Sequence, residues 1–166
     1  FEADGLVNKW LEERPDHNES ARYFRADEDA NYVSRHRIDV GQIEPQVAKP
    51  FSPDNVYGVS EIRGMPLHGA FIGACTTTEE ELVLSGLVLE RMLASGHRPA
   101  IQTEKRLVVP GDLEITARLR DAGLLNVYEQ AGFRVGPPGC SMCLGIASEK
   151  ASQDEVWLTS QNRNYQ

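Results

Sequence analysis

The 166-residue sequence has no long hydrophobic run, few basic residues and only three cysteines. No apolar stretch approaches the roughly 18 residues that a membrane-spanning helix needs, so we expect no membrane partner. The 17 Lys and Arg residues are outnumbered by 25 Asp and Glu residues, which gives a net charge of −8. No nucleic acid is expected as a partner, because phosphate binding needs a basic stripe and the sequence shows none.

Three cysteines cannot all pair in disulfides, and reduced thiols are typical of intracellular proteins. We therefore expect a cytoplasmic location or the mitochondrial matrix. Hydrophobic residues make up 40% and charged residues 25% of the chain, which is ordinary for a globular domain with its own core. The chain begins at Phe1 and ends in a polar run, so we expect a single domain excised from a longer polypeptide.

In the second half of the chain, short apolar segments alternate with segments of helical pattern. Strands are expected at 70–73, 105–109, 133–135 and 156–159, and helices at 79–95, 113–121 and 124–131. Thr78 and Glu81 fit a capping box, and the leucines of the following helix cover more than one face, so we expect that helix to be well buried. The alternation predicts an α/β fold with three layers, α/β/α, in which helices cover both sides of a mainly parallel sheet.

The first half is less regular. A short helix is expected within residues 1–13, a strand at 35–40 and another at 56–59. Three prolines between Gly41 and Asn55 forbid long regular structure there, so that stretch is interpreted as an ordered connector.

Residues able to bind metals or anions follow the predicted strands. Cys75 comes after the first strand of the second half, Cys140 and Cys143 come after the third, and Arg163 comes after the fourth. In open α/β sheets, ligands gather outside the carboxyl ends of the strands, so these residues are expected to converge. Three thiolates at one point form an incomplete ligand set that leaves a coordination position open for chemistry.

Three other interpretations of the cysteines remain open. The cysteines could be three unrelated buried thiols, two of them could form a redox pair at the C-x-x-C spacing, or all three could bind zinc with His68 as a fourth ligand. Zinc is disfavoured because His68 precedes a strand and should lie at the far end of that strand from Cys75. An iron–sulfur cluster needs thiolates in glycine-rich loops, which Gly73, Gly139 and Gly145 supply.

A polar segment, Ser160-Gln161-Asn162-Arg163-Asn164, follows the last predicted strand. It is either a solvated loop or a binding loop. In the second interpretation the planar guanidinium of Arg163 donates two parallel hydrogen bonds to a substrate carboxylate, and Asn162 is a neighbouring hydrogen-bond donor.

Five short stretches together resemble the aconitase family of hydro-lyases, and within it the large subunits of isopropylmalate isomerase and homoaconitase. The stretches are Phe-Ile-Gly-Ala-Cys-Thr at 71–76, Val-Val-Pro-Gly at 108–111, Gly-Leu at 123–124 with Ala-Gly-Phe at 131–133, Pro-Gly-Cys-Ser-Met-Cys-Leu-Gly at 138–145, and Ser-Gln-Asn-Arg-Asn-Tyr at 160–165. The resemblance extends upstream to about residue 38. It divides the chain into a poorly matched segment, 1–35, and an aconitase-like iron–sulfur domain, 36–166.

The resemblance implies a [4Fe–4S] cluster held by Cys75, Cys140 and Cys143, with Arg163 and Asn162 binding substrate. It implies a hydro-lyase that isomerises a 2- or 3-hydroxy di- or tricarboxylic acid by dehydration and rehydration, most similar to 3-isopropylmalate dehydratase of leucine biosynthesis. The family's acid–base residues would lie outside this segment. The implied partners are the hydroxy acid, the remaining domains of the same chain, and a swivelling domain or small subunit.

The sequence departs from the family pattern next to the first cysteine. Ala74 and Thr77 stand where the family usually has serine and asparagine, and the acidic run 79–81 replaces a basic residue. The ligands survive these changes, which bear on substrate identity more than on cluster binding. The alternatives are a homoaconitase or aconitase-type hydratase, and a non-catalytic metal- or RNA-binding relative.

Overall fold

The computed structural model describes residues 4–13, 25–100, 105–143 and 150–161. The chain divides into two compact units, Phe1–Gln42 and Ile43–Gln166. All the cysteines belong to the second unit, and Asn162 and Arg163 lie outside the described residues.

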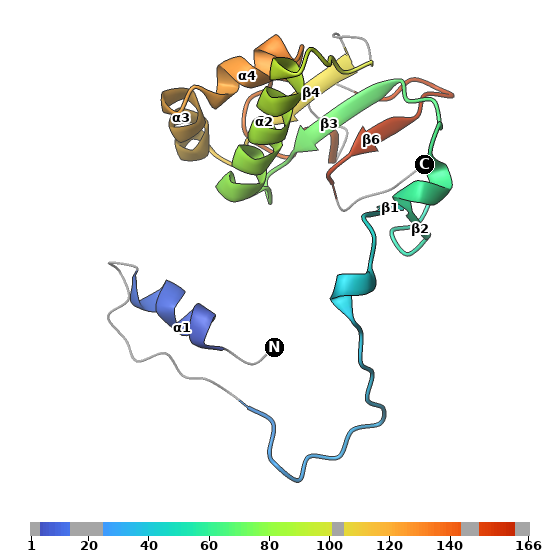
Figure 1. The fold of residues 1–166 in the computed structure, drawn as a ribbon, viewed down its shortest axis with the longest axis vertical. Coiled ribbons are helices and arrows are strands. Elements are labelled where there is room, and N and C mark those ends of the chain that lie inside the picture. Colours follow the sequence, from blue (N-terminus) through green and yellow to red (C-terminus); the bar gives the residue numbers. More distant parts are fainter. Residues whose placement is uncertain (1–3, 14–24, 101–104, 144–149, 162–166) are drawn as a thin grey trace. The chain divides into compact units, whose positions relative to one another are not determined.

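Within the described part of the second unit, four strands form a parallel sheet in the order β5–β4–β3–β6 (Figure 1). They are β3 (Gly69–Gly73), β4 (Arg106–Val109), β5 (Arg134–Val135) and β6 (Trp157–Thr159). Phe71 in β3 pairs with Leu107 of β4 and with Thr159 of β6. The chain moves outward from β3 to β5 and then places β6 on the other side of β3. The strand order therefore changes direction between β3 and β6.

Three helices cover one face of this sheet (Figure 1). They are α2 (Glu79–Ala94), α3 (Leu113–Asp121) and α4 (Leu124–Gln130). Val108 of β4 packs with Leu82, Leu119 and Tyr128 from the three helices, and all four residues are 1% exposed or less. The Tyr128 hydroxyl donates a hydrogen bond of 2.7 Å to the Leu82 carbonyl, which joins α4 to α2.

The opposite face of the sheet carries a smaller core. Phe71, Leu107 and Val109 point to this face, as strand alternation requires, and pack with Ala74. Met142, Cys143 and Trp157 are partly buried against them. The predicted α/β class with a mainly parallel sheet is confirmed. In the described part of the chain, this second face is covered by a 3-10 turn, η4 (Ser141–Cys143), together with the Trp157 side chain.

The helix caps follow the sequence signals. Thr78 Oγ1 accepts from the Glu81 amide at 3.3 Å, and Glu81 Oε2 accepts from the Thr78 amide at 2.9 Å, so the predicted capping box is confirmed. Asp112 Oδ1 accepts from the Ile115 amide at 2.7 Å and starts α3. Gly96, with a φ of +79°, ends α2 in the left-handed conformation that glycine tolerates best.

The expected deep burial of the long helix is wrong. In α2 the buried residues are Leu82, Gly86 and Leu89, whereas Leu84 is 65% exposed and Val88 is 53% exposed. The helix packs against its neighbours along one stripe, as a surface helix does. The leucines outside that stripe have no described element covering them.

One further expectation is corrected. Residues 35–40 form no strand: they are exposed, and none of the described strands pairs with them. Arg106 lies within β4, and despite its charge it is only 8% exposed. Its guanidinium donates to the Ala131 carbonyl, and that hydrogen bond offsets the cost of burying the charge.

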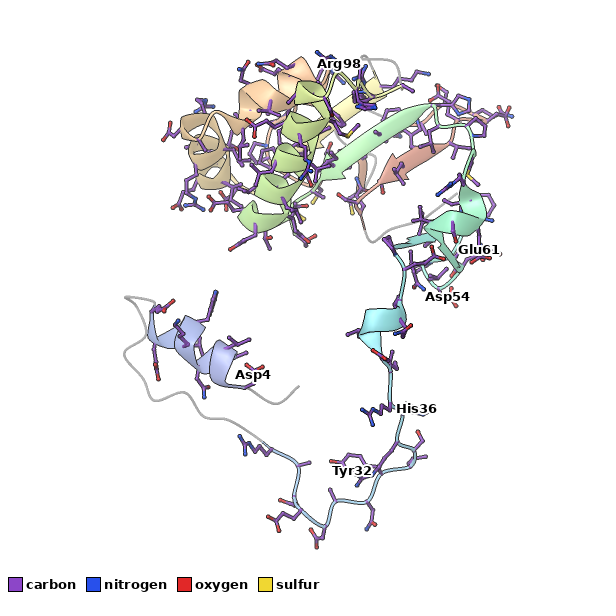
Figure 2. The ribbon with its side chains drawn as sticks, in the orientation of Figure 1. Asp4, Tyr32, His36, Asp54, Glu61 and Arg98 are labelled. Atoms are coloured by element: carbon purple, nitrogen blue, oxygen red, sulfur yellow. The ribbon has the colours of Figure 1, made fainter. Side chains whose placement is uncertain are left out.

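A β-hairpin and a short turn precede the sheet in the second unit. Strand β1 (Gln46–Ala48) pairs antiparallel with β2 (Val56–Gly58), and the 3-10 turn η2 (Val59–Ile62) follows. Figure 2 labels Asp54 in the hairpin loop, where the Ser52 hydroxyl donates to it and lowers the pKa of its carboxyl. The proline-containing connector is thus ordered, as predicted.

The first unit contains helix α1 (Gly5–Glu12) and the 3-10 turn η1 (Val40–Gln42). Asp4, labelled in Figure 2, caps α1 by accepting hydrogen bonds of 2.9 Å from the amides of Leu6 and Val7. Among the described residues, no helix has both the length and the hydrophobicity to span a membrane.

Candidate metal centre

The first cysteine is presented by a sharp bend at the end of β3. Gly73 has a φ of +122°, and a Cβ at this position would lie 1.9 Å from the Val109 carbonyl oxygen, so only glycine fits. The next residue, Ala74, is 4% exposed and also has a positive φ, of +121°. Its amide donates to the same Val109 oxygen at 3.2 Å. Cys75 therefore lies outside the buried strand, directly after this bend, and its side chain is exposed.

The cysteine pair is presented by the loop that follows β5. The Gly136 amide donates to the Val108 carbonyl at 2.8 Å and holds the start of this loop against β4. Gly139 has a φ of +147°, and a side chain there would meet no atom within 4 Å. The chain then forms η4, in which the Cys143 amide donates to the Cys140 carbonyl at 2.9 Å. Both of these cysteines are half-buried.

The two loops bring thiols together across 65 positions of sequence. The Sγ atoms of Cys140 and Cys75 lie 3.9 Å apart, and none of the three cysteines forms a disulfide. Cys143 lies in the same turn as Cys140 and packs on the apolar layer that contains Ala74. Among the residues that the structure describes, no group of three or more His, Cys, Asp or Glu side chains is arranged to hold a metal ion. The geometry thus brings two of the predicted ligands, Cys75 and Cys140, close together, and the third, Cys143, follows Cys140 by three residues in the same turn.

The end of β6 adjoins the Cys75 loop. The Ser160 hydroxyl accepts a hydrogen bond of 3.0 Å from the Gly73 amide, and the Ser160 amide donates to the Phe71 carbonyl at 3.1 Å. Because all pairings in this sheet are parallel, the ends of β3, β5 and β6 share one edge. Among the described residues, the Cys75 loop, the Cys140 loop and Ser160 thus lie at one edge of the sheet, and the prediction that the three cysteines form one site with Arg163 stays a prediction. The binding residues Asn162 and Arg163 fall outside the described residues.

His68 lies at the other end of β3. Its Nδ1 accepts from the Val156 amide at 3.0 Å, and its own amide donates to the Val156 carbonyl at 2.8 Å. It therefore pairs the starts of two strands, away from the carboxyl edge where Cys75 lies. This placement removes the fourth ligand that the zinc alternative needed.

The chemistry of the donor set fits an iron–sulfur cluster, although only Cys75 and Cys140 approach each other directly in the described part of the chain. Thiolates are the ligands that such clusters use, and here they stand on loops that contain Gly73 and Gly139. The floor beneath them is apolar, formed by Ala74, Val109 and their neighbours. An apolar floor limits water access and lowers the local dielectric constant, both of which tune a metal centre.

Sequence reasoning missed the role of Ser160. It was quoted within the polar segment, but its hydrogen bond to Gly73 requires knowledge that β6 pairs with β3. The available signal was a small hydroxyl residue directly after an apolar strand.

Comparison with known proteins adds the evolutionary context. The sequence profile of the aconitase family (aconitate hydratase) matches residues 58–166. The chain is 47% identical over 167 residues to a protein named aconitase htyD from Aspergillus rugulosus, covering 99% of this chain and 19% of that protein. It is 45% identical over 167 residues to a protein of Glarea lozoyensis named 3-isopropylmalate dehydratase large subunit gloJ, with the same coverage.

An archaeal relative shows the same likeness at a greater distance. The chain is 38% identical over 146 residues to 3-isopropylmalate dehydratase large subunit 1 of Methanopyrus kandleri, covering 87% of this chain and 33% of that protein. The chain thus spans about a fifth of the length of the two fungal relatives and about a third of the archaeal one.

Proposed function

This chain belongs to the aconitase family, and from that membership we propose that it is the cluster-bearing part of a hydro-lyase. The substrate class is a 2- or 3-hydroxy di- or tricarboxylic acid, isomerised by removal and return of water. Relatives named 3-isopropylmalate dehydratase large subunit favour a 3-isopropylmalate-like substrate. The observation that carries the proposal is the 3.9 Å approach of Cys75 and Cys140 at the carboxyl edge of the sheet.

Cys75, Cys140 and Cys143 would hold a [4Fe–4S] cluster. When bound, the cluster supplies a Lewis acid at the one iron that has no protein ligand, which polarises the carbon–oxygen bond of the substrate hydroxyl. The protein's part is to fix the thiolates. The bend at Gly73 and Ala74 sets the position of Cys75, and the η4 turn sets the spacing of the other two ligands.

Arg163 and Asn162 are proposed to bind substrate carboxylate. They follow β6 in the sequence, and Ser160 at the end of that strand bonds to the Cys75 loop. An arginine suits this task because its planar fork can donate two parallel hydrogen bonds to one carboxylate. No general acid or base is assigned within this chain.

The remaining partners are also proposals. We assign the domain that carries the cluster to residues 36–166, and we infer that other domains of the same polypeptide complete the active site. The words "large subunit" in the names of two relatives indicate a separate small subunit for those proteins. A swivelling domain or small subunit is therefore the expected partner here.

Anaerobic reconstitution of the full-length protein with iron and sulfide tests the cluster. We expect broad absorbance in the blue part of the visible spectrum, together with bound iron and acid-labile sulfide. Serine in place of Cys75, Cys140 or Cys143 should prevent stable assembly, because each change removes one thiolate ligand. Met142→Leu is the matched control, since it alters the same turn at nearly constant volume and keeps all three thiols. A colourless product that retains zinc would contradict the proposal.

A further inference from the structure

The bend before Cys75 is held from both neighbouring strands, but by different kinds of group. From β4, the Val109 carbonyl accepts a hydrogen bond of 3.2 Å from the Ala74 amide. From β6, the Ser160 hydroxyl accepts one of 3.0 Å from the Gly73 amide. The first contact joins two backbone groups, so it does not depend on the side chain at 109. The second contact exists only while residue 160 carries an acceptor in its side chain.

The Ser160 hydroxyl takes the place of a backbone acceptor at the end of the sheet. Strands β3 and β6 lie side by side (Figure 1), and their pairing ends with Phe71 opposite Thr159. The Ser160 amide then donates to the Phe71 carbonyl at 3.1 Å. Hydrogen bonds in a parallel pair are evenly spaced, so the Gly73 amide would next donate to a backbone carbonyl of β6. The described pairing stops before that bond, and the Ser160 hydroxyl accepts from Gly73 instead.

The amide that this hydroxyl satisfies belongs to a buried residue. Gly73 is buried, and so is Ala74, which follows it in the bend. A buried amide without an acceptor is unfavourable, because it loses its hydrogen bond to water and gains none within the protein. Without the hydroxyl, conformations in which the bend opens and the Gly73 amide reaches water would therefore become more populated. Cys75 follows Gly73 by two residues and would move with the bend.

The loop of the partner thiol is held independently of β6. The Gly136 amide donates to the Val108 carbonyl of β4 at 2.8 Å, four residues before Cys140. An opening of the Gly73 bend would therefore move Cys75 without moving Cys140 in the same way. The separation of 3.9 Å between the two Sγ atoms thus depends on the bend staying closed.

We propose that Ser160 is a positioning residue for the metal centre: its hydroxyl holds the Gly73 amide and thereby keeps the Cys75 thiol beside the Cys140 thiol. Ser160 is not itself a ligand in this assignment. The identity of the bound group rests on the proposed function, whereas the pairing of the two thiols is a property of the metal-free chain. The assignment goes beyond the proposed function because it names a residue outside the ligand set that controls how the ligands are held.

The test measures the effective concentration of the two thiols for one another in the metal-free, full-length protein. A Cys143→Ser background is equilibrated with mixtures of reduced and oxidised glutathione, and the disulfide between Cys75 and Cys140 is quantified by mass spectrometry of its peptides. Each disulfide formed consumes two protein thiols and one oxidised glutathione and releases two reduced glutathione molecules. A loop held beside its partner gives a high effective concentration, and a loop that opens gives a low one.

Three substitutions in this background separate the hydroxyl from the rest of the side chain. Ser160→Ala should lower the effective concentration about five- to a hundredfold, the range expected when a buried donor is left unpaired. Ser160→Thr keeps the hydroxyl and should stay within about twofold of the parent protein, since residue 160 is exposed and a methyl group has room. Ser152→Ala is the matched control and should change nothing, because Ser152 is exposed and its side chain forms no hydrogen bond within the described part of the chain. An unchanged value for Ser160→Ala, or a value for Ser160→Thr as low as that for Ser160→Ala, overturns the proposal.

Iron retention gives a second measurement that does not depend on activity. With all three cysteines present, the reconstituted Ser160→Ala protein should lose iron to a chelator faster than the wild type, about five- to a hundredfold, and Ser160→Thr should lose it at the wild-type rate. Equal rates for all three proteins overturn the proposal.

The positioning role and the proposed function fail separately. If the wild type assembles no cluster, the proposed function fails, and the glutathione equilibrium still decides the role of Ser160. If the wild type assembles the cluster and Ser160→Ala leaves the thiol pairing unchanged, the proposed function stands and the positioning role fails.

Discussion

Replacing Gly73 by alanine tests how the Cys75 loop is held in place. The added Cβ would lie 1.9 Å from the Val109 carbonyl oxygen and 2.8 Å from its carbonyl carbon. These are backbone atoms of the paired strand β4, so they cannot rotate away as a side chain would. Forced overpacking costs about 1–3 kcal/mol, and a side chain at a φ of +122° costs a further 1–3 kcal/mol or so. We expect a local loss of about 4 kcal/mol.

Hydrogen exchange of peptides from β3 and β4 measures this loss. Because 1.4 kcal/mol is a factor of ten, protection of the β3–β4 amides should fall about a thousandfold. Gly64→Ala is the matched control, since its φ is +86° but a Cβ there meets no atom within 4 Å. It should leave the exchange of the β3–β4 amides unchanged. If Gly73→Ala left their protection within threefold of the wild-type value, the steric argument would be refuted.

Three further predictions concern individual side chains. Arg163→Lys should keep the cluster absorbance but raise KM about ten- to a hundredfold, because an ammonium cannot reproduce two parallel hydrogen bonds; unchanged kinetics would contradict the carboxylate role. In Glu155, the Lys105 ammonium, assisted by two N–H donors, lowers the carboxyl pKa from 4.5 to about 2. This contribution to stability is present above pH 4.5 and is lost toward pH 2. The melting temperature of the metal-free Glu155→Gln variant should therefore lie below that of the wild type at pH 7. The difference between the two melting temperatures should disappear between pH 4.5 and 2. Tyr128→Phe removes the hydrogen bond to the Leu82 carbonyl and should therefore cost about 1 kcal/mol at pH 7. Burial raises the pKa of Tyr128 from 10.0 to about 12, so the wild type should lose stability as the pH rises from 10 to 12 and the variant should lose less. Equal alkaline melting curves would contradict this.

Local sequence signals predicted the second half of the fold well. The capping box at Thr78 and the cap at Asp112 depend on residues three positions apart, so the sequence displays them directly. Glycines placed after apolar segments likewise marked the helix ends. The strand at 35–40 failed because loose alternation in an exposed segment does not ensure a partner strand.

Burial and non-local contacts were harder to predict. Leucines on more than one face indicated that α2 is well buried. How much of a helix is covered depends on which elements pack against it, and the sequence of the helix does not contain that information. For the metal centre, chain order and the rule about strand ends placed Cys75 beside the Cys140 loop correctly. The hydrogen bond from the Gly73 amide to the Ser160 hydroxyl could not be predicted, because it joins residues 87 positions apart and forms only when β6 pairs with β3.

The backbone at Ala74 shows why the position of Cys75 depends on two neighbouring strands. A non-glycine residue at a φ of +121° is strained, and such strain persists only where the surrounding structure enforces it. Two contacts enforce it here: the Val109 carbonyl holds the Ala74 amide from β4, and the Ser160 hydroxyl holds the Gly73 amide from β6. The position of Cys75 therefore depends on the end of β6 as well as on β4, although neither strand is next to Cys75 in the sequence.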